Sequence, residues 1–131
     1  MSQWRRFAIE EVPFCKQAIE QATDPYEMWT NIYEQLERAY GETPQNETKI
    51  SQIYRFAFRC HQNKGPKHIC RDVWIFFERL FSNGREIEDD LPNRVPASVF
   101  NYFQRSFEDW YSQSRSDHLT RKYHAAKHQN M

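Results

Sequence analysis

Helix start and stop signals divide this sequence into segments, and apolar side chains recur at helical spacing within each segment. The clearest start is Asp24-Pro25-Tyr26-Glu27, which supplies an N-cap acid, a proline at the first helical position and a glutamate three residues after the cap. The following segment carries one apolar face, made of Trp29, Ile32, Tyr33, Leu36 and Tyr40. This pattern predicts a helix over residues 25–40.

Three further segments show the same signals. Thr43-Pro44 has the form of a second helix start, and Asn63-Lys64-Gly65-Pro66 has the form of a stop and a turn. From Pro66 to Ser82 the apolar residues extend nearly all round the expected helix, which predicts the central and most buried element. Residues 85–95 form the longest stretch without a pattern, and Pro96 starts another helix.

The two ends of the chain are also predicted to be helical. Pro13 should kink or split the first helix, because it removes a backbone donor and clashes with the preceding turn. After residue 113 the sequence turns polar, which predicts a locally basic tail or frayed helix over 114–131. No segment alternates as a strand would. We therefore expect an all-α protein with a single compact domain of five or six helices over residues 1–113, arranged as a bundle or an orthogonal array.

The charge balance, the apolar runs and the cysteine content indicate the compartment and the kinds of partner to expect. Lys plus Arg equals Asp plus Glu at 18 each, so no global attraction to nucleic acid or to an anionic membrane follows. The longest apolar run, residues 73–77, is far too short to span a bilayer, and the first residues lack the apolar core of a secretory signal. The odd cysteine number, three, favours free thiols in a reducing compartment. We expect a cytoplasmic protein that does not associate with membranes.

One turn carries residues that could bind a metal or act as a thiol site: Cys60, His61, His68 and Cys70. Zinc takes four such ligands in a tetrahedron. The spacing argues against zinc, because adjacent Cys60 and His61 diverge on a helix and the usual ligand pairs are separated by two to four residues. Two buried thiols beside two surface histidines is the simpler interpretation. We expect no cofactor, and a metal or thiol protein stays an alternative.

The sequence lacks the common catalytic motifs. It contains no G-x-S-x-G, no G-x-x-x-x-G-K-[ST] and no H-E-x-x-H. A cysteine could still pair with a histidine in space, which sequence alone does not show. The sequence therefore favours a non-enzymatic role and leaves an enzyme open.

An acidic stretch and several aromatic residues suggest a surface for another protein. Exposed Trp, Tyr and Arg side chains are typical anchors of protein interfaces. The acidic residues, predicted to form a docking loop for a basic partner, are Glu86, Glu88, Asp89 and Asp90; the aromatic ones are Tyr26, Tyr102, Trp110 and Tyr111. Reversing the charges of Glu88 and Asp89 should then weaken partner binding and leave stability nearly unchanged. For each of these residues, ordinary packing or solvation is the alternative.

The C-terminal tail suggests a different function. Residues 114–131 hold four basic side chains against one acid, and the basic ones are Arg115, Arg121, Lys122 and Lys127. Such a cluster can contact a few phosphates. A nucleic-acid-associated regulator that uses this tail is therefore the alternative to a protein-binding domain.

The middle of the chain resembles a family of small, uncharacterised helical proteins of bacteria. The resemblance covers about residues 50–110 and rests on Ile53-Tyr54-Arg55-Phe56-Ala57, Cys60, Asp72-Val73 and Phe76-Phe77-Glu78-Arg79-Leu80, with Leu91-Pro92, Val99-Phe100 and Phe107 in the same outline. The stretch from Gln62 to Lys67 is longer and more basic than in that family. The resemblance carries over no site residue. It implies a small accessory protein, a character that fits an immunity protein or an inhibitor.

Overall fold

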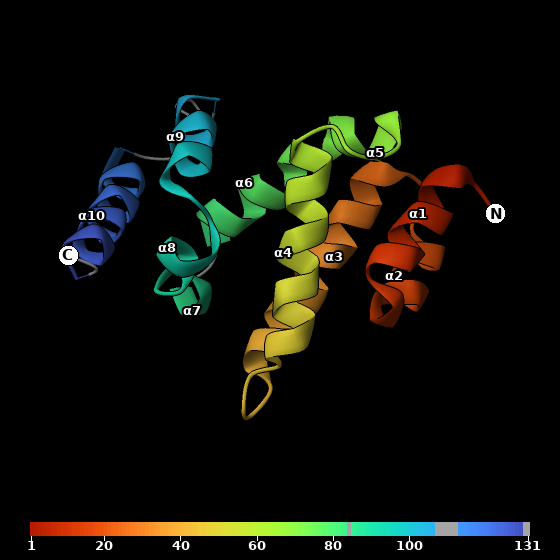
Figure 1. Ribbon diagram of the computed structural model, residues 1–131, viewed down its shortest axis with the longest axis horizontal. Coiled ribbons are helices and arrows are strands. Elements are labelled where there is room, and N and C mark those ends of the chain that lie inside the picture. Colours follow the sequence, from red (N-terminus) through yellow and green to blue (C-terminus); the bar gives the residue numbers. More distant parts are fainter. Residues whose placement is uncertain (84, 107–112, 130–131) are drawn as a thin grey trace. The chain divides into compact units, whose positions relative to one another are not determined.

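The structure, a computed structural model, describes residues 1–83, 85–106 and 113–129 (Figure 1). All regular elements in these ranges are helices, so the predicted all-α class is confirmed. The helices in these ranges outnumber the five or six expected, because two predicted segments are each divided into shorter helices and residues 85–95 contain two more. Contacts within the chain define two compact units, residues 1–76 and 77–131, which are described separately.

The first unit is built around α3. Its elements are α1 (Gln3–Glu11), the 3-10 helix η1 (Pro13–Cys15), α2 (Lys16–Gln21), α3 (Pro25–Gly41), α4 (Glu47–His61), α5 (Lys67–Asp72) and the start of α6 (Trp74–Asn83). Helix α3 packs against α2, α4 and α5, and Figure 1 shows α3 and α4 side by side. The chain leaves the α-helical path between α1 and η1, where the missing N–H of Pro13 was expected to split the helix.

Local capping determines where α3 and α4 begin. Asp24 Oδ1 accepts a hydrogen bond from the Glu27 N–H at 2.8 Å, as the predicted cap requires. The predicted start of α4 at Thr43-Pro44 is wrong, because the helix begins at Glu47. Asn46 Oδ1 accepts from the Lys49 N–H at 3.1 Å, so the acceptor that satisfies the first turn lies after the proline.

Trp29 lies at the centre of the first unit. Its side chain is fully buried and its ring stacks on Phe56 with the centroids 4.8 Å apart. The indole N–H donates to the Ile69 carbonyl at 2.8 Å, so the polar atom of this buried ring is satisfied. This contact joins α3, α4 and α5 into one core.

The single long helix predicted from Pro66 to Ser82 is wrong. Helix α5 ends at Asp72 and α6 begins at Trp74, with Val73 in a turn between them. Apolar side chains are buried on both sides of the break, so their periodicity does not reveal it.

The second unit is formed by the end of α6 together with α7 (Arg85–Glu88), α8 (Leu91–Arg94), α9 (Ala97–Ser106) and α10 (Gln113–Gln129). The stretch 85–95, expected to lack regular structure, therefore contains two short helices. Ile87, Leu91 and Val95 are all buried and follow one another at intervals of four residues. Three positions are too few to identify a helical period from sequence.

Aromatic packing forms the core of the second unit. Phe103 of α9 stacks on Phe77 with the ring centroids 4.6 Å apart, and Phe100 meets Phe81 edge-on at 5.5 Å. The predicted polar tail forms α10, which packs against α8 and buries Leu119 completely. In the described ranges no helix is long and apolar enough to cross a membrane.

Candidate functional site

The acids predicted to form a docking loop lie on and after α7 and face basic side chains of their own unit. Glu88 is buried, with 8 % of its surface exposed. Arg115 donates to Glu88 Oε2, and His118 Nε2 lies 2.8 Å from Glu88 Oε1. Asp89 pairs with Lys122, and Asp90 accepts from Arg94 Nε at 2.9 Å.

These contacts bring together two groups that the sequence analysis assigned to different functions. Arg115 and Lys122, predicted to contact phosphates, instead neutralise Glu88 and Asp89. Arg121 is exposed on α10. The side chains of Glu86 and Lys127, also named in these two predictions, lie outside the part of the chain that the structure describes.

The environment of Glu88 favours its ionised form. Burial by itself would raise the pKa of this carboxyl, but the hydrogen bonds from His118 and Arg115 outweigh burial and hold its pKa below the ordinary value. Arg115 is held in turn, because its Nε donates to the Phe81 carbonyl at 3.1 Å. Reversing the charge of Glu88 would place a cation among cations, so for this residue the structure leads us to expect a loss of stability.

The turn with the two cysteines and two histidines directs its thiols and imidazoles to different environments. Cys60 and Cys70 are buried and form no disulfide, and burial together with the neighbouring Cys70 thiol raises the pKa of the Cys60 thiol. His68 is exposed and His61 is half-buried, and burial lowers the pKa of His61. Nowhere in residues 1–83, 85–106 and 113–129 do three or more His, Cys, Asp or Glu side chains form a group that could hold a metal ion.

Two of the four aromatic residues predicted to bind a partner are exposed. Tyr26 at the start of α3 has 51 % of its surface exposed, and Tyr102 on α9 has 58 %. Tyr26 lies in the first unit, where its ring meets that of Trp74 edge-on at 6.4 Å. Tyr102 lies in the second unit, edge-on to Phe103 at 5.0 Å. Trp110 and Tyr111 lie outside the described residues.

The outer face of α9 gathers interface-type side chains around Tyr102. We call this face the α9 surface, and it consists of Ser98, Asn101, Tyr102 and Arg105, all exposed. These four residues line an open hollow of about 470 Å³. Their spacing of three and four residues places them on one side of the helix, opposite the buried Phe100 and Phe103. Tyr102 was predicted from the sequence, whereas its three polar neighbours have the pattern of ordinary solvated positions and give no signal of a site.

A pocket adjoins the α9 surface at Asn101, which lines both hollows. This aromatic pocket of about 370 Å³ is lined by Pro92, Ala97, Phe100, Asn101, Thr120, Tyr123, His124 and Ala126. Phe100 and Tyr123 stack in parallel with their centroids 4.5 Å apart. The Tyr123 hydroxyl is buried without a hydrogen-bond partner among the described residues, and burial raises the pKa of this hydroxyl. A buried hydroxyl without a partner is costly.

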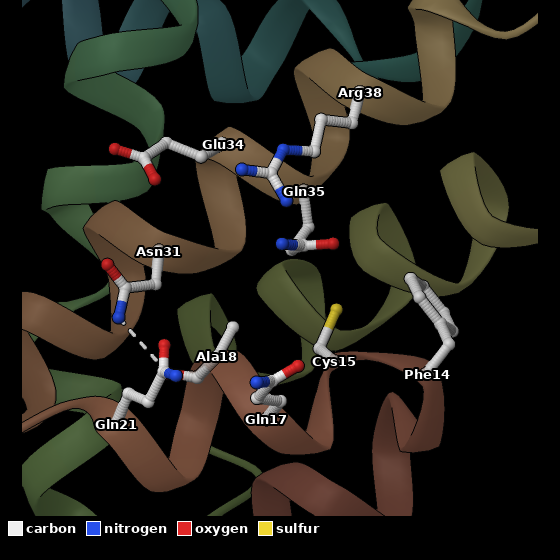
Figure 2. A pocket seen from close by; sticks show the side chains of 9 residues that line it. All are labelled: Phe14, Cys15, Gln17, Ala18, Gln21, Asn31, Glu34, Gln35 and Arg38. Atoms are coloured by element: carbon white, nitrogen blue, oxygen red, sulfur yellow. Dashed lines mark hydrogen bonds between the residues drawn. The ribbon is translucent and has the colours of Figure 1, made fainter.

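A second hollow, in the first unit, is polar. This groove of about 350 Å³ lies between the α2 side, which contributes Phe14, Cys15, Gln17, Ala18 and Gln21, and α3, which contributes Asn31, Glu34, Gln35 and Arg38 (Figure 2). The four α3 residues share one helix face. These four residues could not be predicted as a site from the sequence, because a polar helix face is ordinarily solvated. This face of α3 is part of a groove only because it lies opposite α2.

No protein-family model, curated protein or solved structure matches this chain at a significant level. The resemblance of residues 50–110 to small bacterial helical proteins therefore stays a prediction.

Proposed function

We propose that this chain is a non-enzymatic protein-binding domain whose partner docks on the α9 surface and inserts a side chain into the aromatic pocket. The observation that carries the proposal is Tyr102, an aromatic side chain held 58 % exposed on a helix that is hollowed on this face. Tyrosine loses little conformational entropy on binding and combines a large apolar ring with a polar tip.

The chemistry of the surface describes the partner. Arg105 is exposed and makes no ion pair with another described residue, so it favours an acidic group on the partner. The stacked rings of Phe100 and Tyr123 favour an apolar or aromatic anchor. A partner with a carboxylate beside an aromatic or aliphatic anchor fits both features.

The acidic residues on and after α7 contribute less to this proposal than the sequence suggested. Glu88 and Asp89 are neutralised by Arg115 and Lys122, and a charge that is already paired attracts a basic partner weakly. The basic tail is weakened as a nucleic-acid site for the same reason.

The test is a pull-down of the tagged full-length chain from its own cells, with and without nuclease, followed by mass spectrometry. We expect one protein in near-equal stoichiometry with the wild-type chain in both samples. Tyr102→Ala should lose it, with Kd raised about thirtyfold or more, as for interface hot spots. Tyr26→Ala, a similarly exposed tyrosine in the other unit, is the matched control and should retain it.

Two results would contradict this proposal. One is equal capture by Tyr102→Ala and the wild-type chain; the other is loss of the captured material on nuclease treatment, which would favour the nucleic-acid alternative. We further propose, from the resemblance to small accessory proteins, that the chain is an immunity protein or inhibitor. In that case an equimolar amount should abolish the activity of the captured partner, and Tyr102→Ala should not.

A further inference from the structure

One hydrogen bond connects the two walls of the polar groove between α2 and α3. Asn31 Nδ2 donates to the Ala18 carbonyl at 3.0 Å, which joins the two helices at one end of the groove (Figure 2). Away from this contact, Gln35 extends from α3 toward Gln17 and Cys15 on the opposite wall (Figure 2). The space between them is a surface groove of about 350 Å³, within the range of about 300–1,000 Å³ typical of small-molecule sites.

The polar groups in this groove have unused bonding capacity. Within the described residues, the side chains of Gln17, Gln21 and Gln35 make no hydrogen bond, and Glu34 and Arg38 make no ion pair. Each amide offers a carbonyl acceptor and two N–H donors, which complement a peptide group. The Arg38 guanidinium offers a planar set of donors that matches a carboxylate, and the Glu34 carboxylate accepts from an ammonium group.

The charges in the groove are balanced and separated. Glu34 and Arg38 lie four residues apart on α3, so their Cβ atoms are about 5–6 Å apart, and the two side chains do not pair. In an extended dipeptide the terminal ammonium and carboxylate are about 6–7 Å apart, at about 3.3–3.6 Å per residue.

The groove is suited to binding and not to thiol chemistry. Burial raises the pKa of the Cys15 thiol to about 12, and the charge of Lys49 offsets only part of that effect. The thiol therefore stays protonated at neutral pH and is a poor nucleophile. Cys15 and Ala18 instead provide a small apolar floor.

We propose that this groove binds a short free peptide of the dipeptide class, with its carboxylate on Arg38, its ammonium group on Glu34 and its peptide group among the three glutamine amides. The site lies in the first unit and does not depend on the α9 surface.

Titration of ¹⁵N-labelled full-length protein with three forms of one dipeptide tests this proposal. The probes are Ala-Ala, N-acetyl-Ala-Ala, which lacks the ammonium group, and Ala-Ala-amide, which lacks the carboxylate. Ala-Ala should shift the backbone amide resonances of residues in α2 and α3 that line the groove, and it should bind more tightly than either blocked form.

Two substitutions assign the charges. Glu34→Gln should raise the Kd for Ala-Ala about three- to tenfold and leave N-acetyl-Ala-Ala unchanged, because only the ammonium contact is lost. Arg38→Met should raise the Kd of both carboxylate-bearing forms by a similar factor and leave Ala-Ala-amide unchanged. Arg55→Met, at an exposed position on α4 outside the groove, is the control and should change none of them.

Three outcomes would overturn the proposal. They are no shift in the groove with Ala-Ala up to tens of millimolar, equal shifts with all three forms, or the same effect from Arg38→Met and Arg55→Met. Glu34 and Arg38 are exposed, so both variants should keep the wild-type spectrum outside the groove, and a spectrum that changes throughout would identify a folding defect.

Discussion

At the scale of single residues, Glu88, the last residue of α7, is more buried than the acids Asp89 and Asp90 that follow it. Its carboxylate is 8 % exposed, faces Arg115 and His118, and belongs to a helix of only four residues. A short helix contributes little stability by itself, so the contacts of Glu88 with α10 are expected to hold α7 in place.

Glu88→Gln removes this charge and keeps the shape of the side chain. We expect the free energy of unfolding to fall by about 1–3 kcal/mol, because Arg115 loses its ionised partner in a largely buried position. Thermal and urea unfolding measure this change. Asp89→Asn is the control: Asp89 is 77 % exposed, and loss of its pair with Lys122 should cost less than about 1 kcal/mol. Equal losses for the two variants would show that burial of Glu88 contributes nothing.

The destabilisation caused by Glu88→Gln should depend on pH. Because the pKa of Glu88 is lowered in the folded protein, its contribution to stability is present above its ordinary value of 4.5 and disappears as the pH falls through the lower folded value. The difference in unfolding free energy between wild type and Glu88→Gln should therefore be largest above about pH 5 and shrink toward pH 3. A difference that does not change over this range would contradict the assignment.

At the scale of elements, α9 has a buried face and an exposed face on opposite sides. Phe103 is 2 % exposed and stacked on Phe77, whereas its neighbour Tyr102 is 58 % exposed. Adjacent positions on one helix point about a quarter-turn or more apart, so one face packs the core and the other remains available to a partner.

Alanine substitutions at these adjacent positions should separate packing from binding. Phe103→Ala is expected to lower the free energy of unfolding by about 3–5 kcal/mol, through lost burial and the cavity left behind. Tyr102→Ala should change it by no more than about 0.5 kcal/mol, as for surface positions, while abolishing partner binding. If Phe103→Ala does not fold, Phe103→Leu provides an intermediate loss that can still be measured by thermal unfolding. Equal destabilisation by both alanine variants would contradict the division of faces.

At the scale of the whole molecule, the charges are balanced within each unit. Residues 1–76 and residues 77–131 each contain equal numbers of acidic and basic side chains. Neither unit therefore has a net charge that would attract a nucleic acid, and the cations of α10 are in part already paired.

We expect weak binding to duplex DNA with a shallow salt dependence. Four phosphate contacts would give a slope of log K against log salt of about −3 to −4, and the pairing of Arg115 and Lys122 should keep the wild-type slope well below this. Combining Glu88→Gln with Asp89→Asn frees both cations and should steepen the slope. Titrations from about 50 to 200 mM salt measure it. A steep wild-type slope, unchanged by the double variant, would restore the basic tail as a nucleic-acid site.

Features that depend on residues close together in the sequence could be predicted from the sequence. The start of α3 depends on Asp24, Pro25 and Glu27, which act within one turn, and its apolar stripe extends over several turns. The split at Pro13 follows from the chemistry of one residue. The all-α class followed from these signals. Exposure of Tyr26 and Tyr102 was expected from an excess of aromatic residues, which is a property of composition.

Which side chains contact each other depends on the packing of the helices. Glu88 and Arg115 are 27 residues apart in sequence, and Asp89 and Lys122 are 33 apart, so their pairing depends on how α7, α8 and α10 pack. The polar groove needs two helix faces opposite each other, and the sequence shows each face as solvated. The break at Val73 lies in a continuous apolar stretch, where packing against other elements outweighs local periodicity. Helix formation depends on interactions between residues close together in the sequence. A binding surface also combines residues that are distant in the sequence and meet only when the helices pack.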